Sequence, residues 1–114
     1  MLRAAPGLVV IDEAYYAFAD ASFIGRVMEF PNLLVLRTVA RMGMACVRLG
    51  YAVAVPEWIA ELNKLRQPYN LSGLTQAVAP VLRAGGELLA QQAAVIRAER
   101  ARLAARLSVL PGVR

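Results

Sequence analysis

Histidine is absent from this 114-residue chain, cysteine occurs once, at Cys46, and lysine once, at Lys64. Without histidine the chain lacks the commonest metal ligand and the commonest general base, which excludes zinc sites and Ser-His-Asp or Cys-His catalysis. A single cysteine also excludes an internal disulfide bond. We therefore expect no metal centre, and Lys64 is the only side-chain amine that the chain offers.

Long hydrophobic runs are also missing. The apolar stretches LVVI, LLVL and YAVAV are far shorter than the ~18 residues that span a bilayer. The N-terminal segment MLRAAPGLVVIDE has one arginine and a short apolar run, but Asp12 and Glu13 end that run and no small-residue cleavage site follows. These features predict a cytoplasmic protein without a membrane partner.

Acidic residues are few, with 8 Asp and Glu against 13 Lys and Arg and a net charge of +5. Such a balance suits nucleic acid or anionic lipid, but the arginines are scattered along the chain. The densest cluster lies on one predicted helix with Glu87 and Glu99 interspersed, which is typical of a solvated helix face. This cluster consists of Arg97, Arg100, Arg102 and Arg106. We expect no nucleic-acid partner.

Apolar residues are in excess. They form 59% of the chain, and charged residues form 18%, whereas ordinary soluble domains have roughly 45–50% and about 25%. The length suits one small domain with its own core. The excess predicts surfaces that are meant to be covered by other parts of a protein.

Three apolar segments have the character of buried strands. They are residues 8–11, which end on Asp12, residues 33–38 (LLVLRT) and residues 48–54 (RLGYAVA). The segments that join them have crossover length, which predicts an α/β fold with a largely parallel sheet covered on both faces. Three strands would leave two open edges, so the sequence looks cut from something larger.

Helix patterns dominate the second half of the chain. These predicted helices span residues 56–66, 72–83 and 87–107, and an earlier helix is predicted over residues 22–30, starting at Ser22. The helix over residues 72–83 is expected to kink at Pro80 and to close at Gly85-Gly86. The apolar stripe of the last helix consists of Leu89, Ala93, Ile96, Leu103 and Leu107.

Charge is distributed unevenly between two strand ends. Asp12 follows the first strand, while the stretch LRTVARMGMACVRLGY, residues 36–51, carries Arg37, Arg41 and Arg48 after the second. Ligands of open α/β sheets bind at the carboxyl ends of the strands, so these groups are expected to face one crevice. A ligand with a cationic ring at one end and a phosphate at the other fits that polarity, and pyridoxal phosphate is such a molecule.

The order and spacing of four motifs make the chain resemble a known family. GLVVIDEAYYAFA, FPNLLVLRTVARMGMACVRLGYAVA, LNKLRQPYN and RAERARLAARL together are similar to the central part of histidinol-phosphate aminotransferase, a fold-type I pyridoxal-phosphate enzyme. The resemblance implies part of the large domain of such a transferase, with three or so mostly parallel strands, flanking helices and a long C-terminal helix. Residues 1–84 would be the partial cofactor-binding domain, and residues 85–114 a helix leading toward a C-terminal small domain.

The resemblance also implies roles for individual residues. Asp12 matches the aspartate that pairs with the pyridine nitrogen of the cofactor, and Tyr15 matches the tyrosine that reaches its phenolic oxygen. Arg48 matches the arginine that grips the phosphate, where a planar fork of donors gives charge-assisted bonds. Arg37 and Thr38 belong to the same motif and are expected to support the phosphate loop.

Two positions of the motif depart from the family pattern. Ala40 stands at the phosphate-binding serine position, and Arg41 at the position of the lysine that forms the Schiff base. A guanidinium stays protonated and has no free lone pair to attack an aldehyde, so covalent attachment of the cofactor is not expected. Lys64 lies outside the motif and is expected in solvent. Cys46 replaces a usual glycine, where the backbone would need glycine's freedom.

The family transfers an amino group between L-histidinol phosphate and 2-oxoglutarate in histidine biosynthesis, as a homodimer. The resemblance therefore implies a small-molecule amino donor, a 2-oxo acid, and N- and C-terminal parts of the subunit that this chain lacks. With Arg41 at the lysine position we expect the chain to be inactive. The alternatives are a non-catalytic module that binds pyridoxal phosphate or another small phosphate, and a vestigial structural product.

Overall fold

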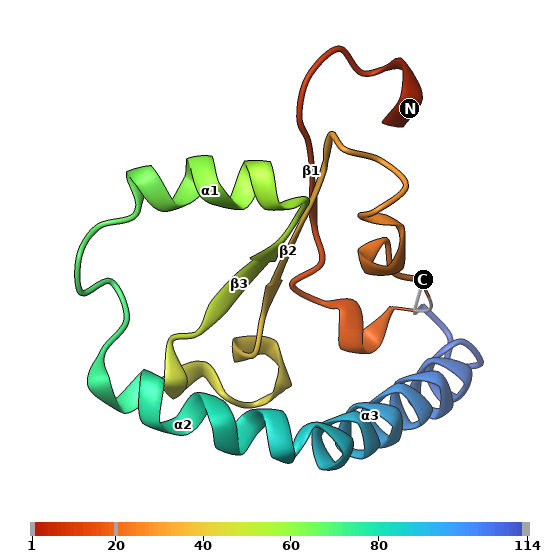
Figure 1. Ribbon diagram of the computed structural model, residues 1–114. Coiled ribbons are helices and arrows are strands. Elements are labelled where there is room, and N and C mark those ends of the chain that lie inside the picture. The colour runs from red at the N-terminus through yellow and green to blue at the C-terminus, as the bar shows by residue number, and fades with distance from the viewer. Residues whose placement is uncertain (1, 20, 113–114) are drawn as a thin grey trace.

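A computed structural model describes residues 2–19 and 21–112, which form a three-stranded sheet with α-helices beside it (Figure 1). The strands are β1 (Val9–Asp12), β2 (Leu33–Thr38) and β3 (Gly50–Val53). The α-helices are α1 (Pro56–Leu65), α2 (Gly73–Ala84) and α3 (Gly86–Leu107). Short 3-10 turns are η1 (Leu2–Ala4), η2 (Tyr16–Phe18), η3 (Ile24–Arg26), η4 (Ala40–Met42) and η5 (Ala45–Val47).

The sheet has the order β1-β2-β3 and is mixed. Strands β1 and β2 are parallel, with Asp12 opposite Leu36, whereas β2 and β3 are antiparallel, with Thr38 opposite Gly50. The α/β class is confirmed, but the largely parallel sheet is wrong for the second pairing. Residues 39–49 contain only 3-10 turns and no crossover helix, and a parallel return needs a longer crossover connection.

The core lies on one face of this sheet. Alternate residues of a strand point to the same side, so every second position of β1 and β2 is covered here. Leu33 and Val35 of the central strand have no exposed surface at all. The cluster that they form also contains Leu2, Val27 and Phe30, with Val9, Ile11, Phe23 and Val53 packed against it.

The segment that covers this face, residues 22–30, was predicted as a helix and is not one. It forms the single 3-10 turn η3, and the Ser22 hydroxyl accepts the N–H of Ile24 at 3.1 Å. A helix this short would be marginal on its own, and here Val27 and Phe30 turn into the core instead. Packing against the sheet therefore overrides the helix-start pattern.

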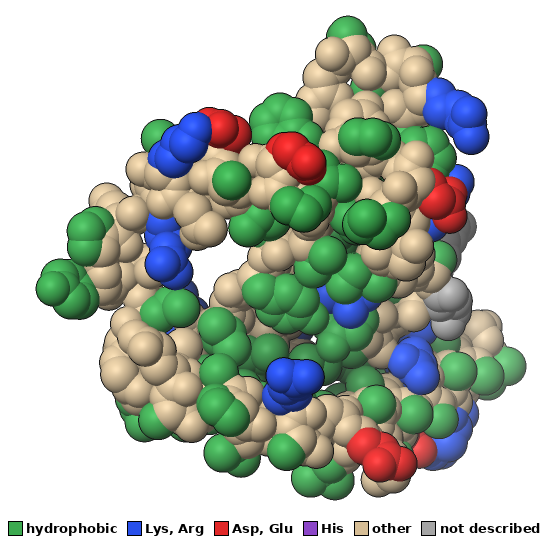
Figure 2. Space-filling view, viewed as in Figure 1, with side chains coloured by type: hydrophobic (Ala, Val, Ile, Leu, Met, Phe, Trp, Pro, Cys, Tyr) green, Lys and Arg blue, Asp and Glu red, His purple; other side chains and the backbone are tan. Residues whose placement is uncertain are grey.

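The opposite face of the sheet is less completely covered. Leu34 is buried on this side, but Val10 and Leu36, which point to the same side, are 52% and 39% exposed, so the expected cover on both faces is only partly found among the described residues. Figure 2 shows apolar side chains gathered across the middle of the visible face, with an open gap between α1 above and α2 below.

The dimensions agree with this open shape. The radius of gyration is 17.7 Å, whereas a compact domain of this length has about 13 Å. The accessible surface is 8635 Å², against roughly 6100 Å² for a compact protein of this mass. The apolar excess of the sequence is therefore exposed surface that the described part of the chain does not cover.

Helices α1 and α2 begin where the sequence predicts. Pro56 occupies the first turn of α1, and the Trp58 indole N–H of the same helix donates to the carbonyl of Pro31 at 2.9 Å. Ser72 caps α2 by accepting the N–H of Thr75 at 3.1 Å. The buried Thr75 hydroxyl donates to the carbonyl of Val47 at 2.8 Å, which joins α2 to η5. Pro80 lies inside α2, as expected.

Helix α3 is covered over only part of its predicted stripe. Leu89 and Ala93 are buried, but Ile96 and Leu103 are half exposed. The basic cluster is also only partly solvated, because Arg97 donates to the carbonyl of Ala17 and Arg100 to that of Phe18 at 3.4 Å. These two arginines fasten α3 to η2, which corrects the expectation of a wholly solvated face.

None of the helices in residues 2–19 and 21–112 has both the length and the apolar character that a bilayer crossing requires. The last two residues of the predicted 85–114 segment, residues 113–114, lie outside the described part.

Truncating the centre of the core tests this packing. Leu33→Ala should lower the free energy of unfolding by about 2–5 kcal/mol, because it removes a fully buried side chain and leaves a cavity. Leu65→Ala, at a side chain that is 82% exposed, should change it by less than about 0.5 kcal/mol. Urea unfolding followed by circular dichroism measures both, and equal losses would contradict the assignment of the core.

Candidate functional site

A pocket of about 470 Å³ lies at the carboxyl end of β1. It is bounded by that strand end, the turn that follows it, and η4 beyond β2. Three of the residues singled out in the sequence, Asp12, Tyr15 and Arg41, line it together. The other lining residues are Ile11, Glu13, Ala14, Tyr16, Ala19, Ala21 and Phe23.

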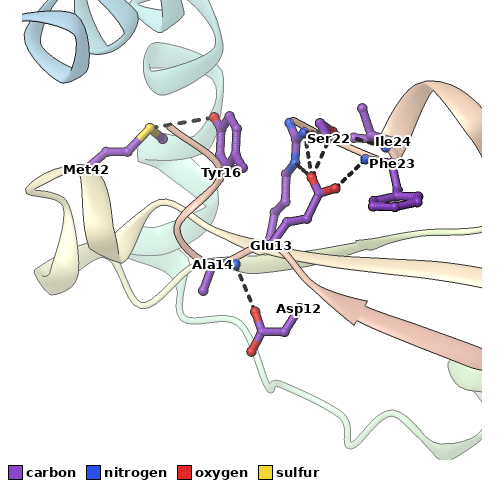
Figure 3. A network of polar contacts seen from close by, with 9 residues as sticks. Asp12, Glu13, Ala14, Tyr16, Ser22, Phe23, Ile24 and Met42 are labelled. Carbon is purple, nitrogen blue, oxygen red and sulfur yellow. Dashed lines mark hydrogen bonds and ion pairs between the residues drawn. The ribbon is translucent and has the colours of Figure 1, made fainter. Parts of the chain in front are cut away.

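Asp12 is the last residue of β1, and its side chain is exposed. One carboxylate oxygen accepts the N–H of Ala14 at 2.8 Å, which folds the chain back just after the strand (Figure 3). A carboxylate has about four acceptor sites, so this bond leaves capacity for a donor from a ligand. Asp12 can therefore serve as an anionic acceptor at the pocket.

Tyr15 and Arg41 meet across the pocket. The guanidinium carbon of Arg41 lies 5.0 Å from the centroid of the Tyr15 ring, which is within the range of a cation–π contact. Tyr15 is 58% exposed, and Arg41 is exposed as well. Position 41, where the resemblance implies a reactive lysine, thus presents a cation beside an aromatic face.

Ala40 and Arg48 do not line this pocket. Ala40 begins η4, and its N–H donates to the Thr38 hydroxyl at 3.1 Å. The same hydroxyl donates to the carbonyl of Leu49 at 3.0 Å. Thr38 therefore ties together both ends of the loop that carries Ala40, Arg41 and Arg48.

Arg48 ends η5 in the left-handed region, with φ 54°, and its side chain is exposed. The sequence led us to expect a glycine-like backbone conformation at Cys46. Cys46 is not among the positive-φ residues, whereas Arg48 is. Cys46 is an exposed free thiol. No group of three or more His, Cys, Asp or Glu side chains placed to hold a metal ion occurs in residues 2–19 and 21–112.

Glu13 and Arg37 form a buried ion pair that the sequence reasoning missed. The exposed fractions of their side chains are 6% and 11%, and one Glu13 oxygen lies 2.9 Å from Nη2 and 3.1 Å from Nε of Arg37. That oxygen also accepts the Ser22 hydroxyl at 2.9 Å, and the other oxygen accepts the N–H of Phe23 at 2.5 Å (Figure 3). Arg37 therefore contacts the turn after β1, not the phosphate loop that it was expected to support.

Hydrogen bonds and the opposite charge keep both members of this pair ionised although they are buried. Burial alone would raise the pKa of Glu13, but the Phe23 N–H, the Arg37 guanidinium and the Ser22 hydroxyl together hold it below its ordinary value of 4.5. Burial would likewise lower the pKa of Arg37, and the Glu13 carboxylate raises it. Both side chains are thus ionised near neutral pH.

Tyr16 separates the pocket from a larger, mostly apolar cavity. Its ring lies 3.7 Å from the Arg37 guanidinium carbon, and its hydroxyl donates to the sulfur of Met42 at 3.6 Å (Figure 3). Burial raises the pKa of Tyr16, and the neighbouring Tyr51 raises it further. The cavity beyond it, about 540 Å³, lies against α2 and α3.

A signal for the buried pair exists in the sequence. Residues 9, 11 and 13 alternate onto one face of β1, and residues 33, 35 and 37 onto the same face of β2. Glu13 and Arg37 are then the next positions after two paired apolar positions. Opposite charges at matching ends of neighbouring buried rows indicate an ion pair.

Lys64 lies far from this chemistry. It is exposed on α1 and pairs with Glu61 one turn away, with exposed fractions of 67% and 61%. Its solvent position agrees with the sequence expectation.

The carboxyl ends of parallel strands, where this pocket lies, are the place at which open α/β sheets bind their ligands. The family profile described as "Aminotransferase class I and II" matches residues 1–113. The chain therefore belongs to the class I and II aminotransferase family.

Individual relatives carry a more specific name. The chain is 54% identical over 109 residues to histidinol-phosphate aminotransferase of Chromobacterium violaceum. The aligned region covers 96% of the chain and 31% of that protein. The chain is 51% identical over 118 residues to histidinol-phosphate aminotransferase 1 of Ralstonia nicotianae, covering 99% of the chain and 32% of that protein. The chain thus spans about a third of the length of the curated relatives that it matches.

Lowering the pH should destabilise the chain through Glu13. Because its pKa is below 4.5 in the folded state, its contribution is complete above about pH 4.5 and is lost as pH falls through the folded pKa. Glu13→Gln should remove this part of the pH dependence and lower stability at neutral pH, since Arg37 stays buried without its partner. Urea unfolding between pH 3 and 7 measures both effects.

The exposed pair Arg26–Glu29, at 48% and 57% exposed, provides a control. Glu29→Gln should leave stability within about 0.5 kcal/mol at neutral pH. A Glu13→Gln variant with unchanged stability and an unchanged pH profile would contradict the assigned role of the buried pair.

Proposed function

We propose that this chain is the cofactor-facing segment of a histidinol-phosphate aminotransferase-like protein and that, with Arg41 in place, it does not itself transfer an amino group. In the proposed parent reaction the amino group passes between L-histidinol phosphate and 2-oxoglutarate. The observation that carries the proposal is the pocket that Asp12, Tyr15 and Arg41 share.

The residues around the pocket fit noncovalent binding of pyridoxal phosphate. The Asp12 carboxylate has acceptor capacity for the protonated pyridine nitrogen, and a charged partner there keeps that nitrogen protonated. The Tyr15 hydroxyl would be the donor to the phenolic oxygen. When bound, the cofactor supplies an electron sink for reactions at the α-carbon of an amino acid.

Arg41 does not fit covalent attachment. Its guanidinium remains protonated and cannot act as the nucleophile toward the aldehyde of the cofactor. What Arg41 supplies is a permanent positive charge next to the Tyr15 ring. This charge can attract an anionic group, but it provides no base to move a proton at the α-carbon.

The phosphate would be held from the loop between β2 and β3. Arg48 is exposed there, and its planar fork of donors suits a phosphate. Ala40 has no hydroxyl to add, which removes one donor worth about 1 kcal/mol. Phosphate binding would therefore depend on arginine, with support from Thr38 at the base of the loop.

The rest of the assembly is also part of the proposal. Residues 1–84 would belong to the cofactor-binding domain and residues 85–114 to the helix that leads toward a small C-terminal domain. The remaining N- and C-terminal parts of the subunit and a second subunit would complete the site for the amino donor and the 2-oxo acid. We place this protein in the cytoplasm.

A non-catalytic module that binds pyridoxal phosphate or a small phosphate is the second candidate. The exposed cations Arg41 and Arg48 near the strand ends favour it, because they suit an anion without needing an amine. Reversible binding of the cofactor that leaves no covalent adduct would support this reading. A chain with no response to any phosphate ligand would instead be a structural remnant.

Restoring the amine tests the assignment of position 41. In a Lys64→Arg background the chain contains no lysine, so an added Arg41→Lys change supplies the sole side-chain amine. After incubation with pyridoxal phosphate and borohydride reduction, we expect a covalent adduct at position 41 by peptide mass spectrometry. The Lys64→Arg chain alone should carry no side-chain adduct.

Arg66→Lys in the same background is the matched control, because Arg66 is an exposed residue just after α1. Labelling at position 41 should exceed labelling at position 66 at low cofactor concentration and should fall when Asp12 is changed to Asn. Equal labelling of the two positions would contradict the proposal that residue 41 faces a cofactor site.

The role of Arg48 is tested by comparing two ligands. Arg48→Gln in the lysine-free chain should weaken binding of pyridoxal phosphate about tenfold, since it removes a charge-assisted contact. Binding of pyridoxal, which has no phosphate, should stay nearly unchanged. Equilibrium dialysis measures both, and a parallel loss for the two ligands would exclude a specific phosphate contact.

A further inference from the structure

We propose that the Glu13–Arg37 ion pair positions Asp12 and Tyr15, so that the alignment of both pocket residues depends on this pair. The inference rests on the proposed function, because it concerns the pocket assigned to pyridoxal phosphate. It assigns an effect on ligand binding to Glu13 and Arg37, which need not touch the ligand themselves.

The pair lies between the two residues that it would hold. Glu13 directly follows Asp12 and precedes Tyr15 by two positions, and consecutive Cα atoms are a fixed 3.8 Å apart. Glu13 is held through both oxygens, to Arg37 and Ser22 on one side and to the N–H of Phe23 on the other. Immobilising Glu13 therefore limits the movement of both neighbours.

Regular secondary structure does not hold this region. Beyond Asp12 the β1–β2 ladder continues with a single bond, from the N–H of Glu13 to the carbonyl of Leu36 at 2.8 Å. In the described residues between Glu13 and Asn32 the chain forms only the 3-10 turns η2 and η3. Apolar side chains of this region, Phe23, Val27 and Phe30, pack on the sheet. Among the described residues, the side-chain hydrogen bonds that join the region to the sheet are those of Arg37 with Glu13 and Ser22.

Arg37 also secures the aromatic side of the pocket. Its guanidinium carbon lies 3.7 Å from the centre of the Tyr16 ring, and Tyr16 directly follows Tyr15. With Glu13, Ser22 and this ring as partners, the Arg37 guanidinium is occupied within the protein. It therefore acts on a ligand through its neighbours, whereas Arg41 and Arg48 remain exposed.

The carboxylates of Asp12 and Glu13 leave the chain on opposite sides. Figure 3 shows Glu13 directed toward Ser22 and Phe23, and Asp12 directed away from them toward the N–H of Ala14. One carboxylate is thus used for the fold while the other is presented at the surface. The neighbouring acids have separate roles.

A double-mutant cycle tests the coupling. Dissociation constants for pyridoxal phosphate are measured by equilibrium dialysis on the lysine-free Lys64→Arg chain and on its Asp12→Asn, Glu13→Gln and doubly changed variants. Far-UV circular dichroism verifies the fold of each. We expect Asp12→Asn to weaken binding about tenfold in the parent, as for a lost charge-assisted bond, but less than about threefold when Glu13→Gln is already present.

A purely structural role would leave the Asp12→Asn effect the same in both backgrounds, and that result would overturn the inference. Glu29→Gln serves as the acid control, because Glu29 is exposed, and it should preserve the tenfold effect. If Asp12→Asn has no effect even in the parent, the proposed function is refuted, and the inference falls with it because there is no bound group to position.

Ser22→Ala is the second variant, for the case in which Glu13→Gln does not fold. It removes the hydroxyl that bonds to both members of the pair and leaves the two charges together. We expect it to weaken binding about threefold and to reduce the Asp12→Asn effect. An undiminished tenfold effect on the Ser22→Ala background would contradict the positioning role.

Discussion

The buried contact between Glu13 and Arg37 joins the two parallel strands to the turn region that follows β1. The carboxylate accepts from Arg37 and from Ser22 and Phe23 of that region, and the guanidinium lies over the Tyr16 ring. Replacing a buried ion pair by apolar residues is often neutral for stability, and in some proteins such a pair instead specifies a conformation. Here the geometric effect is direct, because the same turn covers one face of the sheet and presents the pocket at its end.

In the proposed site, the anionic residue agrees with the family motif and the cationic residue departs from it. Asp12 and Tyr15 stand at the end of β1 as the family motif implies, while position 41 offers a permanent charge in place of an amine. The loop of residues 39–49 is still closed at its base by the Thr38 hydroxyl. Under the proposed function, this loop would bind a phosphate without the chemistry of a covalently attached cofactor.

The sequence predicts most of the helices and strands, because these follow local signals. The predictions that are wrong concern features that depend on contacts between distant parts of the chain. Helices α1, α2 and α3 follow local signals such as Pro56, the Ser72 cap and an apolar period, and the strands are short apolar runs. The antiparallel return of β3 and the turn at residues 22–30 depend on tertiary packing, which local patterns do not encode. In the site, Asp12 and Tyr15 came from the motif, whereas the alternation that pairs Glu13 with Arg37 can be interpreted only once the parallel register of β1 and β2 is known.

The amide hydrogen of Phe23 tests the central claim most directly. It lies outside any α-helix or strand, and its acceptor is the Glu13 carboxylate at 2.5 Å. Hydrogen exchange followed by NMR at neutral pH should find it strongly protected in the native chain, with protection lost when Glu13 is changed to Gln. If this amide exchanges as fast as those of exposed loops in the native chain, the ion pair does not hold the turn, and the account of the site is wrong.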